Sequence, residues 1–178
     1  MTVTSLARIL ARAAGVAMLI VLPVAHARAQ GAAAGASASP DAAAAIAVAD
    51  SALAAITRGD FVAFTDLMVP EAVLFPTSTR DGVSRYMLRT RETQRTAPLN
   101  RKVTERGWNA EARVNGAIAM VWYPYDLYID NNWSHCGVDV FTMVRQDGRW
   151  RISAITWSAE QPPVCEKHPK GPPPGAKP

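Results

Sequence analysis

The stretch AIAMVWYPYDLYIDNNWSHCGVDVFTMVRQDGRWRISAITWS, residues 117–158, decides the fold. Nine of the chain's 13 aromatic residues lie between Trp108 and Trp157, and aromatic side chains favour strands. Asp147-Gly148 favours a two-residue hairpin turn, because such turns need positive φ at both positions. The stretch therefore predicts three antiparallel strands, at 117–130, 134–145 and 149–158.

The segment before these strands adds a fourth strand and three helices. Asn115-Gly116 is a second hairpin signal, and it predicts a strand at 101–114. A first helix is expected at about 41–58, where Ser39 can cap its start, Pro40 suits the first helical position and Gly59 ends it.

Two shorter helices are expected between the first helix and the strands. One follows Asp60 and carries Phe61 and Phe64. The other follows Asp81, spans about 82–93 and is rich in arginine, which is typical of a solvated face. A short strand at 72–75 separates the two. The order predicts an α+β fold, with three N-terminal helices packed on one face of a curved antiparallel sheet.

The ends of the chain differ from this middle part in composition. Residues 1–29 resemble a secretory signal peptide: Arg8 and Arg12 precede the apolar stretch 13–25, and Ala27-Arg28-Ala29 fits a cleavage site. Residues 30–40 are predicted to be a flexible linker, 41–160 the folded domain and 161–178 a Pro-rich disordered tail. No membrane span is expected after cleavage, and the location is expected to be periplasmic or secreted.

The charge of the chain gives little support to nucleic-acid binding. The formal net charge is +4, but three of the 19 basic residues lie in the predicted signal peptide, which leaves 16 basic and 15 acidic residues. The 178 residues are 49% hydrophobic and 19% charged, as in an ordinary globular domain. No nucleic-acid partner is therefore expected.

The chain has two cysteines, Cys136 and Cys165. An oxidising compartment and an even count favour a disulfide between them, which would tie the tail to the domain. The alternative is two free thiols.

The hairpin turns also predict which strand residues share a face. Tyr128 is expected opposite His135, and Asp139 opposite Thr156. One face then has an apolar end with Trp122 and Phe141, and a polar end with Asp126, Tyr128, His135, Asp139 and Thr156. This gradient predicts a pocket for a small molecule.

The opposite face is apolar, and it is predicted to form a homodimer interface. It carries Val121, Tyr123, Tyr125, Leu127, Ile129, Val138, Val140, Ile155 and Trp157. The alternative is that the helices cover this side of the sheet.

Asp126 and His135 are the candidate catalytic pair. A carboxylate beside an imidazole can orient it and raise its pKa, so His135 would act as general base, with Tyr128 or Asp139 as proton donor. The alternative is a polar pair at the rim of the sheet with no catalytic role. Neighbouring strand residues point to opposite faces, so His135 and Cys136 are not expected to bind a metal together. No metal and no cofactor are predicted.

Three segments resemble the nuclear transport factor 2-like superfamily, which includes SnoaL-like polyketide cyclases, ketosteroid isomerases and scytalone dehydratase. They are AAITRGDF at 54–61, HCGVDVF at 135–141 and DGRWRI at 147–152. The resemblance covers about 41–158 and implies a cone-shaped α+β fold with a pocket for a small, largely apolar molecule. Ala52 and Pro76 stand near the positions where ketosteroid isomerases carry a catalytic Tyr and Asp, so the resemblance does not extend to that chemistry.

The sequence thus predicts an exported domain that binds a small hydrophobic or aromatic molecule. Trp122 and Phe141 would form the pocket wall, and Tyr128 and Thr156 would contribute polar contacts. One alternative is an acid/base enzyme of lyase, isomerase or hydrolase type that uses the Asp126–His135 pair. The other is a protein-interaction module that uses the aromatic face or the Pro-rich tail.

Overall fold

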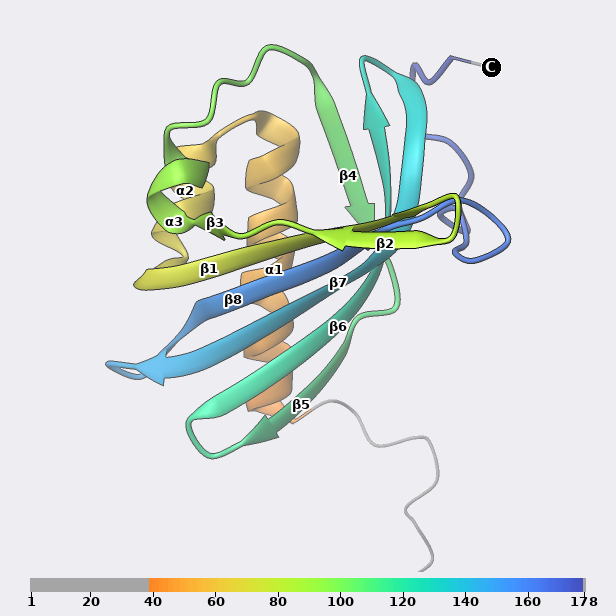
Figure 1. The fold of residues 1–178 in the computed structure, drawn as a ribbon. Coiled ribbons are helices and arrows are strands. Elements are labelled where there is room, and N and C mark those ends of the chain that lie inside the picture. The colour runs from red at the N-terminus through yellow and green to blue at the C-terminus, as the bar shows by residue number, and fades with distance from the viewer. Residues whose placement is uncertain (1–38, 178) are drawn as a thin grey trace, which may run out of the picture. The chain divides into compact units, whose positions relative to one another are not determined.

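Residues 39–177 are described by the computed structural model, and Figure 1 shows how their helices and strands are arranged. The helices are α1 (Pro40–Arg58), α2 (Phe61–Asp66) and α3 (Arg91–Arg95). The strands are β1 (Met68–Arg80), β2 (Val83–Tyr86), β3 (Arg89–Thr90), β4 (Val103–Gly107), β5 (Glu111–Asn115), β6 (Ile118–Ile129), β7 (Asn132–Gln146) and β8 (Arg149–Ala159). The predicted signal peptide and nearly all of the predicted linker lie outside the described residues.

Helix α1 forms as predicted because both of its ends are capped. Ser39 Oγ accepts a hydrogen bond from the Ala42 N–H at 3.2 Å, and Gly59 ends the helix with a φ of 72°. Ala45, Ala49 and Ala52 recur at helical spacing and are fully buried. By length and hydropathy alone α1 could cross a membrane, but its buried face belongs to the core of the domain.

The strands form one curved sheet in the order β2-β1-β8-β7-β6-β4, with β3 paired to β1 and β5 paired to β6. Neighbouring strands are antiparallel, except that β1 and β8 are parallel. Helix α1 crosses one face of this sheet (Figure 1). We call this the inner face, and it carries buried side chains such as Val121, Phe141 and Ile155. The predicted α+β arrangement of N-terminal helices on a curved sheet is confirmed.

The helix predicted at 82–93 is wrong. Asp81 and Gly82 have φ values of 52° and 74°, so the chain reverses there and β2 pairs with the end of β1. Asp-Gly is the same hairpin signal as at 147–148, and here it prevails over the helical spacing that follows. A short helix, α3, begins only at Arg91.

Two predicted strands have different bounds in the structure. The strand predicted at 72–75 is the middle of the longer β1, which continues past both prolines that were expected to bound it. Pro70 lies within a register shift, and Pro76 lies between the residues that pair with β3 and those that pair with β2. Neither proline therefore interrupts a regular ladder. The strand predicted at 101–114 is divided into β4 and β5 around Asn109, which has a φ of 49°.

The predicted register between β6 and β7 is also wrong, and the error inverts part of the face assignment. The chain turns at 130–131, and a bulge near Ser134 adds one residue, so Leu127 rather than Tyr128 lies opposite His135. A second bulge, between β7 and β8, places Asp139 opposite Trp157 rather than Thr156. A shift by one residue moves side chains to the other face.

The corrected register places helix α1 over the face predicted to form a homodimer. Tyr123 Oη, for example, donates to Asp50 Oδ1 of α1 at 2.6 Å. The buried part of this face, around Val121, Tyr125 and Ile155, is therefore core and not available to a second copy. The alternative assignment, with helices on this side, holds for the residues of β6 and β8, whereas Val138 and Val140 of β7 lie on the outer face.

The C-terminal segment (residues 161–177) is held against the sheet, which corrects the prediction of a disordered tail. The predicted disulfide between Cys136 and Cys165 is present, with the two Cα atoms 5.7 Å apart. Further along, the His168 N–H donates to Asp126 Oδ2 at 3.2 Å, and Arg106 donates to the Gly171 carbonyl at 2.9 Å. Long-range contacts therefore order a segment that is neither helix nor strand.

Candidate functional site

A cavity of about 150 Å³ lies between the helices and the inner face of the sheet. Its apolar lining comes from Leu53, Ile56, Phe61, Phe64, Leu74, Leu127, Phe141, Ile155 and Trp157. Its polar lining comes from Arg89, Gln94, Glu105 and Asp139. An apolar cavity of roughly this size can hold a molecule as large as one benzene ring.

Glu105 and Asp139 form a carboxyl pair in this cavity. Strand β4 carries Glu105 and strand β7 carries Asp139, and Asp139 is only 3% exposed. Each carboxyl group shifts the pKa of the other, and a direct hydrogen bond between them requires a proton on one of them, because a carboxylate only accepts. The pair is thus suited to hold or transfer a proton.

Burial sets the proton affinity of this pair. It raises the pKa of Glu105 to about 7, against a smaller lowering effect of the hydrogen bond with Asp139. Burial, followed by the charge of Glu105 and their hydrogen bond, raises the pKa of Asp139 well above its ordinary value. The two groups therefore titrate as a pair, and burial favours the protonated form of each.

One oxygen of the pair lacks a donor. Asp139 Oδ2 is buried and receives no hydrogen bond from a protein N–H or O–H group among residues 39–177. Leaving a buried acceptor unsatisfied costs about 1–3 kcal/mol. A proton shared with Glu105, or a donor group on a ligand, would remove this cost.

Glu105 is positioned by the last turn of α1. Thr57 Oγ1 donates to the Glu105 carbonyl and accepts from the Glu105 N–H, both at 3.0 Å. Strand β4 lies at the edge of the sheet, so these backbone groups would otherwise have no strand partner on that side. Thr57 therefore holds the strand, and with it the carboxyl group, against the helix.

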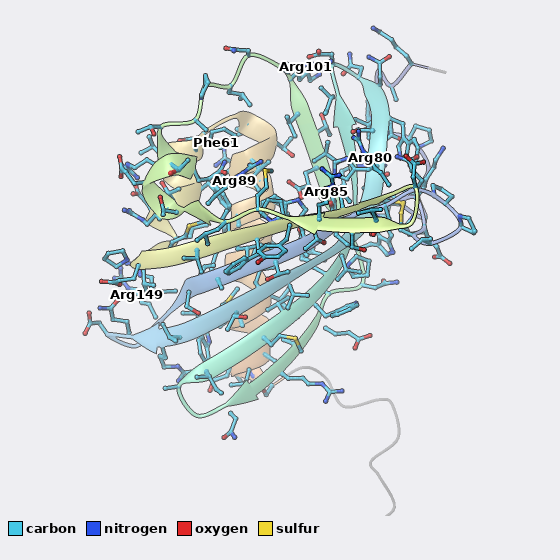
Figure 2. All side chains as sticks on the ribbon, in the orientation of Figure 1. Phe61, Arg80, Arg85, Arg89, Arg101 and Arg149 are labelled. Carbon is cyan, nitrogen blue, oxygen red and sulfur yellow. A yellow bond between two sulfur atoms is a disulfide. The ribbon has the colours of Figure 1, made fainter. Side chains whose placement is uncertain are left out.

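Two nitrogen-bearing side chains enter the cavity from β3 and α3. The Arg89 guanidinium lies 5.9 Å from the centre of the Trp157 ring, and Arg89 Nη1 lies 3.5 Å from Gln94 Oε1. Figure 2 labels Arg89 and Phe61 on the side of the molecule where α2 and α3 lie. The cavity thus combines apolar walls, a carboxyl pair and a cationic group.

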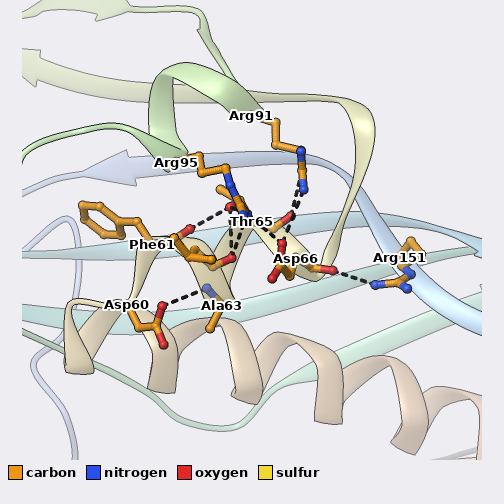
Figure 3. A network of polar contacts seen from close by, with 9 residues as sticks. Asp60, Phe61, Ala63, Thr65, Asp66, Arg91, Arg95 and Arg151 are labelled. Carbon is orange, nitrogen blue, oxygen red and sulfur yellow. Dashed lines mark hydrogen bonds and ion pairs between the residues drawn. The ribbon is translucent and has the colours of Figure 1, made fainter.

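A network of arginine contacts holds α3 against α2 (Figure 3). Arg95 Nη1 donates to Asp66 Oδ1 at 2.6 Å and to Thr65 Oγ1 at 2.9 Å, and Arg91 Nε donates to the Thr65 carbonyl at 2.8 Å. Arg151 on β8 donates to the Asp66 carbonyl at 2.6 Å. The arginines of this segment thus anchor the helix that carries Gln94 instead of forming a solvated face.

The structure divides the predicted pocket residues between the two faces. Asp139 and Phe141 line the cavity. Trp122, which is 46% exposed, and Thr156 lie on the outer face, away from the cavity. The physical reason is the pair of bulges described above, because each one moves part of the predicted set to the other side of the sheet.

The predicted contact between Asp126 and His135 is wrong, since these residues lie on opposite faces. Asp126 is fully buried on the outer face, where Arg106 donates to its two oxygens at 3.0 and 2.6 Å. Tyr128 lies on the same face, with the Arg106 guanidinium 5.4 Å from its ring centre. Asp126 and Tyr128 therefore join the contacts that hold the C-terminal segment.

His135 lies on the inner face, with its ring 5.8 Å from that of Tyr125. Its Nδ1 contacts Ser134 Oγ at 2.9 Å rather than a carboxylate, and burial lowers its pKa. Within the described part of the chain, no three His, Cys, Asp or Glu side chains are grouped to hold a metal ion.

Sequence analysis missed Glu105, Arg89, Gln94 and Trp157 as lining residues. Glu105 belongs to a half-buried strand. A carboxylate on the inner side of such a strand is unfavourable unless it is paired, and this was the signal that could have identified Glu105 as a site residue. Arg89 and Gln94 lie in or next to residues 82–93, which were predicted to form a helix. The side of the chain to which their side chains point therefore could not be predicted. Trp157 was placed on the inner face only by the bulge between β7 and β8.

No protein-family model and no curated protein matches this chain. Solved structures do match it. The beta subunit of a protein assigned as an aromatic-ring-hydroxylating dioxygenase from Novosphingobium aromaticivorans is 12% identical, with a TM-score of 0.57, over 68% of this chain and 90% of that one. A protein of unknown function with a cystatin-like fold from Nostoc punctiforme is 10% identical, with a TM-score of 0.52, over 68% and 93% of the two chains.

A third solved structure is a nuclear transport factor 2-like protein of unknown function from Pseudomonas putida. It is 10% identical, with a TM-score of 0.49, over 72% of this chain and 93% of that one. At such identities the likeness to the two structures with TM-scores of 0.57 and 0.52 shows the fold alone.

Proposed function

We propose that this chain, which has the nuclear transport factor 2-like cone fold, is an exported protein that binds one small hydrophobic or aromatic molecule in its cavity. The observation that carries the proposal is the carboxyl pair of Glu105 and Asp139 inside apolar walls. Buried carboxyl groups are unfavourable for folding unless they are well paired, and perturbed groups in a cavity are typical of functional sites.

Export is supported by two features. The first 29 residues have the charge and hydropathy pattern of a signal peptide. The disulfide between Cys136 and Cys165 fits an oxidising compartment, such as a periplasm or the exterior of a cell.

A cavity-filling substitution tests the binding proposal. Phenol and benzyl alcohol, each with a single ring, serve as probes, and isothermal titration calorimetry measures their binding to the disulfide-bonded protein. Ile56→Trp places a larger side chain in the cavity and should abolish binding. Val83→Trp introduces the same bulky side chain on β2, outside the cavity, at a residue that is 53% exposed, and it should leave binding intact.

Binding that survives in Ile56→Trp would place the probes elsewhere and contradict the proposal. Absence of binding to the unmodified protein would contradict it as well. Native mass spectrometry of exported protein supplies an independent measurement, because a retained natural ligand would add a mass that disappears on denaturation.

A second candidate function is an acid/base enzyme of lyase, isomerase or hydrolase type. The observation that favours it is the carboxyl pair in the cavity, where burial raises the pKa of Glu105 to about 7, because such a pKa suits a group that gains and loses a proton at neutral pH. In this reaction scheme Glu105 removes a proton from the bound molecule and Asp139 donates one. This pair takes the place of Asp126 and His135.

Deuterium incorporation distinguishes the enzyme from a binder. A retained ligand, incubated with the protein in D₂O, should be converted or should gain deuterium at the carbon that loses a proton. Asp139→Asn should slow this exchange, while Asp147→Asn, an exposed change in a turn, should not. An unchanged ligand after long incubation with the unmodified protein would leave only the binding function.

A further inference from the structure

We infer that the molecule bound in the cavity carries a carboxylate on a single ring, and that Arg89, assisted by Gln94, holds this carboxylate. The inference rests on the proposed binding function and specifies its ligand class. Three observations lead to it: the contacts of Arg89, the geometry around its guanidinium, and the charge and size of the cavity.

Arg89 differs from the other half-buried arginines in what it contacts. Each of the others donates to an oxygen within 2.8 Å; they are Arg91, Arg95, Arg106, Arg145 and Arg151. Arg89 forms no ion pair within residues 39–177, and its one hydrogen bond, to Gln94 Oε1, is 3.5 Å long. A partly buried charge without a counter-charge is unfavourable, so the site favours an anion beside it.

The surroundings of Arg89 would suit a planar carboxylate. The guanidinium lies over the Trp157 ring, which restricts its orientation, and both side chains line the cavity. Two parallel N–H groups of a guanidinium match the two oxygens of a carboxylate. The Gln94 side-chain amide N–H₂ donates no hydrogen bond to a described residue, and it can supply a further donor.

The rest of the cavity limits the charge and size of this anion. Glu105 and Asp139 both line this cavity, and two carboxyl groups disfavour a highly charged anion, so a ligand with one negative charge is favoured over a phosphate monoester with two. The volume of about 150 Å³ fits one ring. Asp139 lines the same cavity, and its Oδ2 could accept a hydrogen bond from an O–H or N–H substituent of the ring.

Two probes of nearly equal shape test the inference. 4-Hydroxybenzoate carries the carboxylate, and 4-hydroxybenzamide replaces it by a neutral amide. Isothermal titration calorimetry at pH 7.5 should show that the acid binds at least about tenfold more tightly than the amide, because charge-assisted hydrogen bonds are the stronger ones.

Substitution of Arg89 provides the second measurement. Arg89→Met keeps most of the side-chain volume and should reduce the ratio of the two affinities to about one. Arg113→Met makes the same change at an exposed position on β5, outside the cavity, and should leave the ratio unchanged.

The outcomes separate this inference from the proposed function. If the amide binds as tightly as the acid to the unmodified protein, the carboxylate assignment is wrong and the binding cavity stands. If Arg89→Met keeps the preference for the acid, the assignment to Arg89 is wrong. If neither these probes nor the neutral probes bind, both the inference and the proposed function are wrong.

Discussion

Replacement of Glu105 by glutamine should change how the stability of the protein depends on pH. In the folded protein burial raises the pKa of Glu105 from its ordinary value of 4.5 to about 7. Between these pH values the folded protein keeps a proton that the unfolded chain has lost. The stability that this group contributes is therefore complete below pH 4.5 and is lost as the pH rises to about 7.

The expected magnitude follows from the two pKa values. A change from 4.5 to about 7 corresponds to about 3 kcal/mol of unfolding free energy. Glu105→Gln cannot ionise, so it lacks this loss. Relative to the unmodified protein, the variant should gain about 3 kcal/mol of stability between pH 4.5 and pH 8.

Urea unfolding of both proteins at pH 4.5, 6, 7 and 8 measures this gain, because subtracting the two curves cancels the titrating groups that do not interact with Glu105. Glu111→Gln, an exposed change on β5, is the matched control and should run parallel to the unmodified protein. If the Glu105→Gln curve is also parallel, within roughly 0.5 kcal/mol, Glu105 ionises as in water and the argument for a buried carboxyl pair is refuted.

Three further predictions concern the outer face and the C-terminal segment. Asp126→Ala should lower the unfolding free energy by about 3–5 kcal/mol, since it leaves Arg106 without its buried partner. A loss as small as that of Glu111→Ala, an exposed change on β5, would contradict this. Replacing Cys136 and Cys165 by serine opens a loop with a sequence separation of 29 and should lower the unfolding free energy, measured in urea, by about 3–4 kcal/mol. Equal urea midpoints before and after the replacement would contradict this prediction. We also propose that the protein forms a homodimer through the outer sheet face, where Trp122 and Ile118 are 46% and 59% exposed. Light scattering after size exclusion should show a dimer, and Trp122→Glu should convert it to a monomer. A monomeric unmodified protein at micromolar concentration would disprove the proposal.

Local sequence was sufficient where a few neighbouring residues determine the backbone. Ser39 and Gly59 bound helix α1, and Asp147-Gly148 forms a two-residue turn with φ values of 50° and 73°. The same rule applied at Asp81-Gly82 would have predicted β2 in place of a helix. The disulfide also followed from local information, since only two cysteines were available to pair.

Register could not be predicted from the turns alone. The bulges near Ser134 and between Thr142 and Met143 each shift the pairing by one residue. No local motif marks them, and they arise where long strands bend in a curved sheet. For this reason Asp126 and His135, which the predicted register places side by side, lie on opposite faces, and the apolar face around Tyr123 packs under helix α1.

The sequence by itself determined the helices α1 and α2, the hairpins of the second half and, through them, the α+β class, because helix capping and turn formation depend on neighbouring residues. It also determined the disulfide, because two cysteines allow only one pairing. Only the tertiary structure decided the site. Glu105 on β4 and Asp139 on β7 belong to strands separated by β6, and the curvature of the sheet brings their side chains together beneath α1. Their raised pKa values depend on burial, which is a property of the packed molecule and not of either residue's neighbours in the chain.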